Sequence, residues 1–243
     1  MNPRILEKYA AQFRSEHGYS NQESIHLKSL LHKLSVLAVF RPLAMGISGM
    51  AIKVGTNNRF MLINTARTLG HQHFTICHEL YHLYIQKNFD YHVCQVGYFD
   101  KKAKEEYNAD SFAAKLLMPE EGVITLIPDA ELAKGKISLA TILRIEQYFS
   151  CSRKALLHRL AELNLIKRNH LDELATDVRK SAMAHGYSIK LYKKDNQKEV
   201  IGDYGDLARK LFEQNKISES HYYSLLEDLG VDFSTLQNKG DEE

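Results

Sequence analysis

Cysteine, net charge and long apolar runs are all scarce in this chain of 243 residues. Three cysteines, an odd number at low density, argue against a disulfide scaffold and favour a reducing, cytoplasmic location. The formal net charge is only +2, so a protein that works mainly by binding nucleic-acid phosphates is not expected. The longest apolar run, residues 34–40, is far shorter than the roughly 20 residues that span a bilayer. We therefore expect no membrane segment.

The overall composition is that of an ordinary globular protein. Hydrophobic residues make up 44% of the chain and charged residues 26%. A chain of this length can bury a sizeable core, and one large domain or two small ones are expected. No repeat of fixed period is visible. We predict boundaries near residues 120 and 166.

The local patterns predict many helices and a small antiparallel β-sheet. The capping box Ser20–Glu23 predicts the start of the first helix, and the turn residues 55–58 predict a hairpin between strands 51–54 and 59–63. Pro119 should end another helix. Further helices are predicted at residues 69–86, 101–117, 137–149 and 152–165. A hairpin of strands 187–193 and 198–201 is expected to follow. Two more helices come after it, and the last should end at Gly230.

Histidine is concentrated in one stretch, because five of the twelve histidines lie between positions 71 and 92. Within it, His78-Glu79-Leu80-Tyr81-His82 forms an HExxH pattern on a predicted helix. Residues four apart share a helix face, so His78 and His82 can reach one cation. Glu79 is offset by about 100° around the helix, which places it beside the cation where it can take a proton from water. This spacing suits a zinc hydrolase.

The next predicted helix supplies acidic residues at matching spacing. Glu106 and Asp110 are four apart and share a face. A catalytic zinc needs a third protein ligand and an open position for water, and Glu106 fits the ligand role. Asp110, one turn further, could accept the remaining N–H of a ligand histidine. The sequence therefore predicts a Zn²⁺ site built from two neighbouring helices.

Each half of this site also has a simpler interpretation. The HExxH pattern alone is compatible with an amphipathic helix that carries two half-exposed histidines. Glu106 and Asp110 could belong to a solvated acidic face of a lysine-rich helix. Ala109 and Ala113 argue against the second interpretation, because small residues permit close approach of two helices. Cys77, which precedes the first histidine, is expected to be core and not a ligand.

The residues 74–83, the pair Glu106 and Asp110, and the run 112–119 together resemble the ImmA/IrrE metallopeptidase family. Glu106-x-x-Ala109-Asp110 is similar to the ExxSD/ExxAD motif of thermolysin-like gluzincins, in which the Glu is the third ligand. The resemblance covers roughly residues 45–166, about half of the chain. It implies an α+β fold with three parts: a mainly helical, zincin-like metallopeptidase core at 1–120, a helix-turn-helix-like segment packed on it at 121–166, and a small α+β region of unknown role at 167–243.

The chain departs from the family pattern beside the motif. Tyr81 stands where the family often has glycine, so the groove beside the zinc is expected to be narrower or differently shaped. His71 and His73 stand where arginines are common. His71 lies close to the face of His78 and His82 and could contact substrate or the oxyanion, although a surface histidine at a helix start is an equal alternative. His92 and nearby tyrosines are further oxyanion candidates.

The leading functional hypothesis is a cytoplasmic zinc endopeptidase in which His78, His82 and Glu106 hold Zn²⁺ and Glu79 is the general base. What the resemblance implies is cleavage of a protein substrate, a transcriptional repressor of a mobile element, prophage or stress response. One alternative is a DNA-binding regulator with a non-catalytic metal. A third possibility is one component of a toxin–antitoxin or phage-defence pair.

DNA binding has only a weak basis in the sequence. Residues 137–168 contain six basic and two acidic residues, a net charge of +4 on the helix-turn-helix-like segment. The basic residues are Arg144, Arg153, Lys154, Arg159, Lys167 and Arg168. A docking surface for a protein partner, or a cover for the core, is the favoured interpretation of this segment.

Overall fold

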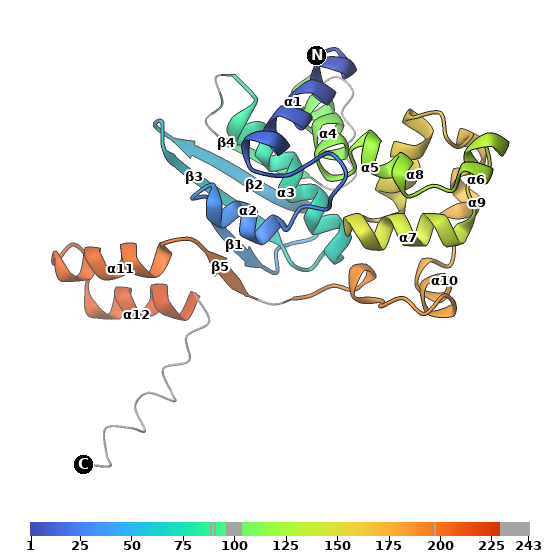
Figure 1. The fold of residues 1–243 in the computed structure, drawn as a ribbon. Coiled ribbons are helices and arrows are strands. Elements are labelled where there is room, and N and C mark those ends of the chain that lie inside the picture. Colours follow the sequence, from blue (N-terminus) through green and yellow to red (C-terminus); the bar gives the residue numbers. More distant parts are fainter. Residues whose placement is uncertain (88, 90, 96–103, 197, 229–243) are drawn as a thin grey trace.

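The computed structural model describes residues 1–87, 89, 91–95, 104–196 and 198–228 (Figure 1). A single β-sheet lies at the centre, with one group of helices beside it and a separate helical hairpin on its other side (Figure 1). The α+β fold class predicted from the sequence is confirmed.

The sheet has five strands in the order β4-β2-β3-β1-β5. Their bounds are β1 Leu37–Arg41, β2 Ile47–Val54, β3 Asn58–Asn64, β4 Tyr91–Gln95 and β5 Glu199–Ile201. Strands β2 and β3 form the predicted hairpin, whose turn contains Gly55 at a φ of +64°. The sheet is mixed and not purely antiparallel as predicted, because β1 pairs in parallel with β3. After β1 the chain passes over the position next to it, forms β2, and then returns to form β3 between β1 and β2. Local sequence patterns do not predict such a step.

Helix α3 (Leu69–Tyr84) packs on one face of the sheet and matches the predicted helix at 69–86. The residues of that sheet face, such as Ala51, Met61 and Ile63, are completely buried. Their alternation with half-exposed neighbours follows the two-residue period of a strand. The sheet therefore serves as the support on which α3 is held.

Two further helices flank α3, and one of them was not predicted. Helix α1 (Pro3–Glu16) begins after Asn2, whose side chain caps it, and buries Leu6 and Phe13. Helix α4 (Lys104–Leu117) matches the prediction at 101–117, of which 101–103 lie outside the described residues.

The helix predicted to start at the Ser20–Glu23 capping box is wrong. The Glu23 carboxylate accepts the Ser20 N–H as in such a box, but no helix follows directly. Helix α2 (Leu27–Lys33) starts after His26, where Leu27, Leu30 and Leu31 can reach the core.

The predicted pair of helices after Pro119 is confirmed. Helices α7 (Leu139–Phe149) and α8 (Arg153–Glu162) begin at Ser138 and Ser152, whose side chains cap them. Two short helices, α5 (Glu120–Thr125) and α6 (Asp129–Lys134), precede them. The α7–α8 turn packs on the first turn of α3, since a Cβ at Gly70 would lie 2.8 Å from the Ser152 nitrogen. The segment 121–166 thus rests directly on α3.

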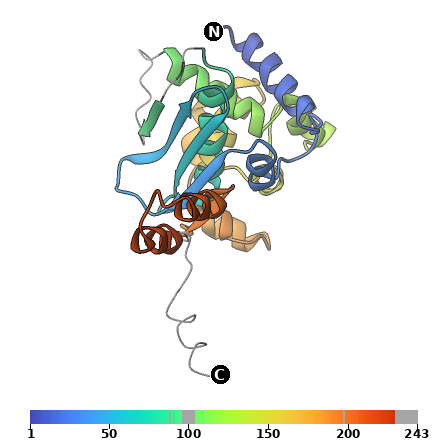
Figure 2. The ribbon, with the colours of Figure 1, turned by 90° about the vertical axis from the view of Figure 1, so that its left-hand side faces the viewer.

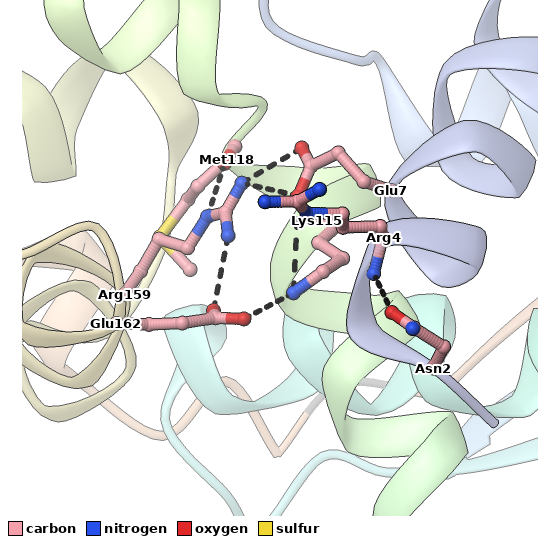
Figure 3. A network of polar contacts seen from close by, with 7 residues as sticks. All are labelled: Asn2, Arg4, Glu7, Lys115, Met118, Arg159 and Glu162. Carbon is pink, nitrogen blue, oxygen red and sulfur yellow. Dashed lines mark hydrogen bonds and ion pairs between the residues drawn. The ribbon is translucent and has the colours of Figure 1, made fainter.

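A buried ionic network joins α1, α4 and α8 (Figure 3). The Arg159 guanidinium donates to Glu7 at 2.8 Å and to Glu162 at 3.0 Å, and its Nε donates to the Met118 carbonyl at 3.1 Å. Lys115 also donates to Glu162. Arg159 and Lys115 are both 1% exposed, whereas Glu7 and Glu162 are 34% and 39% exposed, so buried cations meet partly exposed carboxylates where the three helices join.

The C-terminal region differs from the prediction of a hairpin at 187–201. Residues Lys190–Tyr192 form a 3₁₀ turn, and β5 pairs with β1 of the core. The Tyr192 hydroxyl donates to buried Glu146 and the Tyr192 carbonyl accepts from Arg179, which holds this turn against the helices.

The remaining elements complete this region of the chain. They are a 3₁₀ turn at Arg168–His170 and the helices α9 Leu171–Leu174, α10 Val178–Ala184, α11 Tyr204–Glu213 and α12 Glu219–Asp228. Helices α11 and α12 confirm the two predicted helices, while Gly230 lies outside the described residues. They form a hairpin beyond β5, on the opposite side of the sheet from α5–α9 (Figures 1 and 2). None of the helices in the described part of the chain has the length and apolar character to cross a membrane.

Candidate metal centre

Helix α3 brings two histidine side chains together in the interior. His78 and His82 are four residues apart, so they lie on one face of the helix, and they are 2% and 1% exposed. Their Nε2 atoms are 3.1 Å apart. Two imidazoles therefore direct their outer nitrogens at one point beside α3.

Helix α4 adds a carboxylate at the same point. Ala109 and Ala113 on α4 are fully buried, and small side chains allow the two helices to approach closely. Glu106 places one carboxylate oxygen 3.4 Å from His78 Nε2 and the other 3.5 Å from His82 Nε2. Glu106 thus joins the two predicted histidine ligands from a position 24 or more residues away in sequence.

The three ligand atoms fit a divalent cation by their spacing. Around a tetrahedral zinc with ligands at 2.0–2.1 Å, neighbouring ligand atoms are about 3.3–3.4 Å apart. The separations of 3.1, 3.4 and 3.5 Å in this group match that geometry. Within the described residues, His78, His82 and Glu106 are the one group of three or more potential ligands.

The other ring nitrogens of the two histidines are held by acceptors. His78 Nδ1 lies 2.9 Å from the Asp110 carboxylate, as predicted from the spacing of α4. His82 Nδ1 contacts the Gln86 side-chain oxygen. When both Nδ1 atoms donate, both Nε2 lone pairs face the common point, which suits a cation there. The sequence analysis missed Gln86, although its spacing of four residues from His82 was visible.

Glu79 lies in the core beside this group, on the side of the sheet. Its side chain is completely buried. Gly49 of β2 makes room for it, since a Cβ at position 49 would lie 3.3 Å from Glu79 Oε1 and 2.7 Å from Thr75 Cγ2. The Glu79 carboxylate therefore lies against the backbone of β2, at a position where a side chain larger than glycine would be crowded.

His71, on α3, lies outside the ligand group and contacts β2 next to Gly49. Its Nε2 is 2.9 Å from the hydroxyl of buried Ser48, the residue before Gly49. Burial lowers the pKa of His71, and the charge of Arg67 adds to this effect. His71 is thus a half-buried side chain tied to β2, and not the surface histidine of the alternative interpretation. The side chain of His92, the other oxyanion candidate, lies outside the described residues.

Tyr81, which departs from the ImmA/IrrE pattern, is an interior residue. The side chain is completely buried, with its ring against Phe112 and His82. Its hydroxyl donates to Glu105 at 2.6 Å. The residue fills the space between α3 and α4.

The two cysteines whose side chains are described take no part in the site. Cys77 and Cys151 are buried free thiols. Burial raises the pKa of the Cys77 thiol to about 12, so it stays protonated at neutral pH. Cys77 is core, as predicted.

Two of the six basic residues of the helix-turn-helix-like segment are buried, whereas Arg144, Lys154, Lys167 and Arg168 are exposed. Arg153 and Arg159 of α8 are 3% and 1% exposed. Arg153 donates to the buried Glu146, and Arg159 belongs to the network of Figure 3. Side chains neutralised inside the protein cannot contact phosphates, so only the four exposed basic residues of this segment are available to DNA.

The comparisons with known proteins agree with this geometry. Residues 32–161 match the model of a peptidase family described as the IrrE N-terminal-like domain. The match runs from α2 to α8 and includes all five residues predicted for metal binding and catalysis, His78, Glu79, His82, Glu106 and Asp110. A search of the curated proteins finds no match.

Proposed function

The chain belongs to the family of IrrE N-terminal-like peptidases, and we propose that it is a zinc endopeptidase that cuts a regulatory protein. Membership makes it a metallopeptidase, a hydrolase of peptide bonds whose substrate is a protein. The choice of zinc, the role of each residue and the nature of the substrate are the proposal.

His78, His82 and Glu106 are the proposed ligands. Two neutral imidazoles and one carboxylate are the usual donor set of a catalytic zinc, and three protein ligands leave a position open for water or substrate. A structural zinc is normally closed by four protein ligands. Asp110 and Gln86 orient the two imidazoles through their Nδ1 atoms.

Glu79 is the proposed general base. The observation that carries the proposal is the joint placement of three ligand atoms 3.1–3.5 Å apart with a buried carboxylate one residue after the first histidine. A bound zinc ion would polarise the scissile carbonyl and make a water molecule more acidic. Glu79 accepts the proton of the attacking water and passes it to the leaving amine.

The proposed substrate is a transcriptional repressor in the cytoplasm. Its support is the resemblance to the ImmA/IrrE family together with the scarcity of cysteine. If the protein belongs to a toxin–antitoxin or phage-defence pair, the same metal centre would cut a different substrate protein. The alternative of a DNA-binding regulator would have to use the four exposed basic residues of the helix-turn-helix-like segment, because Arg153 and Arg159 are buried in ion pairs.

The test combines metal analysis with co-expression of the protein and the regulator encoded next to it. The wild-type protein should contain one zinc per chain and cut the regulator at a defined bond, read by mass spectrometry. Glu79→Gln should retain the zinc and lose the cleavage. Glu120→Gln, a matched change of an exposed glutamate, should keep both.

Two results would contradict the proposal. Undiminished cleavage by Glu79→Gln would show that Glu79 is not the general base. If the regulator stays intact in the presence of the zinc-loaded wild-type protein, the repressor is not the substrate.

A further inference from the structure

Three residues of α3 at a spacing of four face the beginning of β2. His71 Nε2 lies 2.9 Å from the Ser48 hydroxyl. The Thr75 methyl group and the Glu79 carboxylate both lie against the next strand residue, Gly49. Residues four apart follow one side of a helix, so one row of side chains along α3 meets one short piece of β2. The position of the Glu79 carboxylate and the path of this piece of β2 are therefore linked.

The strand β2 has one extra residue at this point. Ile47 and Gly49 pair with the consecutive residues 95 and 94 of β4. Ser48 lies between them and has no partner in the described registers of β2 with β4 and with β3. An additional residue on one strand of an antiparallel pair is a β-bulge. The residue that His71 contacts is thus the bulged residue.

The bulge turns two successive residues of β2 toward α3. In a regular strand, successive side chains point to opposite faces of the sheet. Ser48, however, is 3% exposed and contacts His71 of α3. A Cβ at the next position, Gly49, would also point at α3, toward Thr75 and Glu79. If β2 were regular, one of the two residues would have to face away from α3. The close approach of Gly49 to Glu79 therefore depends on the bulge.

Two side chains hold the bulge from its two sides. The buried Asn64 side chain donates to the Ile47 carbonyl at 2.7 Å. On the side of α3, His71 is the hydrogen-bond partner of the Ser48 hydroxyl among the described residues. A buried hydroxyl without a partner is unfavourable. Loss of the His71 side chain therefore favours a path of β2 in which Ser48 turns out of the interior.

We propose that His71 is a positioning residue of the peptidase site, which holds Ser48 in the bulge and thereby keeps the β2 backbone at Gly49 against the Glu79 carboxylate. His71 acts through β2 in this role, and it lies outside the group of three metal ligands. The inference rests on the proposed function, because it gives Glu79 the part of the general base. A displacement of about 1 Å in a reacting group can cost about 100-fold in rate, so the path of β2 should affect kcat.

The kinetic test uses the full, zinc-loaded chain and the regulator encoded next to it as substrate. His71→Ala removes the contact from α3, and Ser48→Ala removes it from β2 with the loss of a single oxygen atom. In both variants kcat should fall by about tenfold or more, while KM and the affinity for zinc stay unchanged. His71→Gln carries an amide nitrogen in place of Nε2 and should recover most of the lost kcat. His32→Ala, at an exposed position of α2, is the control and should behave as the wild type does.

A second measurement observes β2 directly and does not depend on cleavage. Hydrogen exchange of the backbone amides of residues 47–54, followed by mass spectrometry, should be faster in His71→Ala and Ser48→Ala than in the wild type and His32→Ala. The double variant should show no further loss of kcat, because both changes remove the same contact. If the wild-type protein cuts nothing, the proposed function fails, and the exchange rates still show whether His71 holds β2.

Three results would overturn the assignment of His71. Faster exchange with unchanged kcat would show that the contact with Ser48 is only structural. A loss of zinc affinity as large as the loss of kcat would show that His71 acts on the metal ligands and not on Glu79. Additive losses of kcat in the double variant would show that the two residues act independently of each other.

Discussion

The Asp110 carboxylate accepts a hydrogen bond from Nδ1 of His78, at 2.9 Å, across the interface of α4 and α3. This contact fixes the ring so that Nε2 faces His82 Nε2 and Glu106. A carboxylate behind a ligand imidazole also raises its basicity, and losing such a partner typically costs about 10–100-fold in metal affinity.

Asp110→Ala should therefore weaken zinc binding by about 10–100-fold, and Asp110→Asn, which keeps an acceptor oxygen but not the charge, by less. A competition titration with a chromogenic chelator measures both. Asp129→Asn, at an exposed position of α6, is the control and should bind zinc as the wild type does. Unchanged affinity in Asp110→Ala would show that the contact has no influence on the metal.

Gly49→Ala should destabilise the protein and reduce cleavage. The new Cβ would lie 2.7 Å from Thr75 Cγ2 and 3.0 Å from the Leu62 carbonyl oxygen, so β2 must shift away from α3 and Glu79. Overpacking of this kind costs about 1–3 kcal/mol. The double variant Gly49→Ala/Thr75→Ser removes the closest contact and should recover part of the loss in urea unfolding. If the double variant is no more stable than Gly49→Ala, the strain does not come from the contact with Thr75.

Arg159→Ala should cost about 1–3 kcal/mol in the free energy of unfolding, because it removes a buried guanidinium and leaves the carbonyl of buried Met118 without its donor (Figure 3). The matched control is Arg209→Ala. Arg209 also contacts a glutamate at 2.8 Å, but its side chain is 69% exposed, so its loss should cost less than about 1 kcal/mol. Similar losses in urea unfolding for both variants would contradict an interior role of Arg159.

The stability of the protein should fall as pH decreases below about 6.5, in part because of His73. Burial lowers the pKa of His73, while its Nδ1 contact with the Ser150 carbonyl at 2.7 Å opposes the shift in part. The folded state therefore favours neutral His73, and the unfolded state takes up the proton first as pH falls through the ordinary histidine pKa. The stability from this group is present above that pKa and lost below it.

His73→Gln should flatten this pH dependence. Urea unfolding of the wild type and the variant between pH 5.5 and 7.5 measures the difference. His32→Gln, at an exposed position of α2, should leave the wild-type slope unchanged. An identical slope in His73→Gln would assign the pH dependence to other groups.

The metal-centre motifs are the part of the molecule that sequence alone predicted best. His78 and His82 share a face of α3 because their spacing of four is fixed by helix geometry. The helix predicted to begin at residue 152 is α8, which Ser152 caps, since its hydroxyl satisfies a helix N–H two to three residues away. Signals of this kind act within a few residues, so they can be identified without knowledge of the fold.

The errors concern contacts between distant residues. The predicted hairpin at 187–201 fails because Tyr192 bonds to Glu146 and β5 pairs with β1. Ser20 begins no helix, although its local signal is present, because the apolar residues of α2 start only at Leu27.

The sequence by itself determined which residues could meet a metal ion, because the periodicity of α3 and α4 places His78 with His82 and Glu106 with Asp110 on shared faces. Only the tertiary structure decided that the two faces meet and that Gly49 of β2 leaves space for the Glu79 carboxylate. It also decided that Arg153 and Arg159 are buried. The reason is physical: helix geometry is set by neighbours along the chain, whereas the distance between two helices and the burial of a charge depend on side chains that the fold brings in from far away.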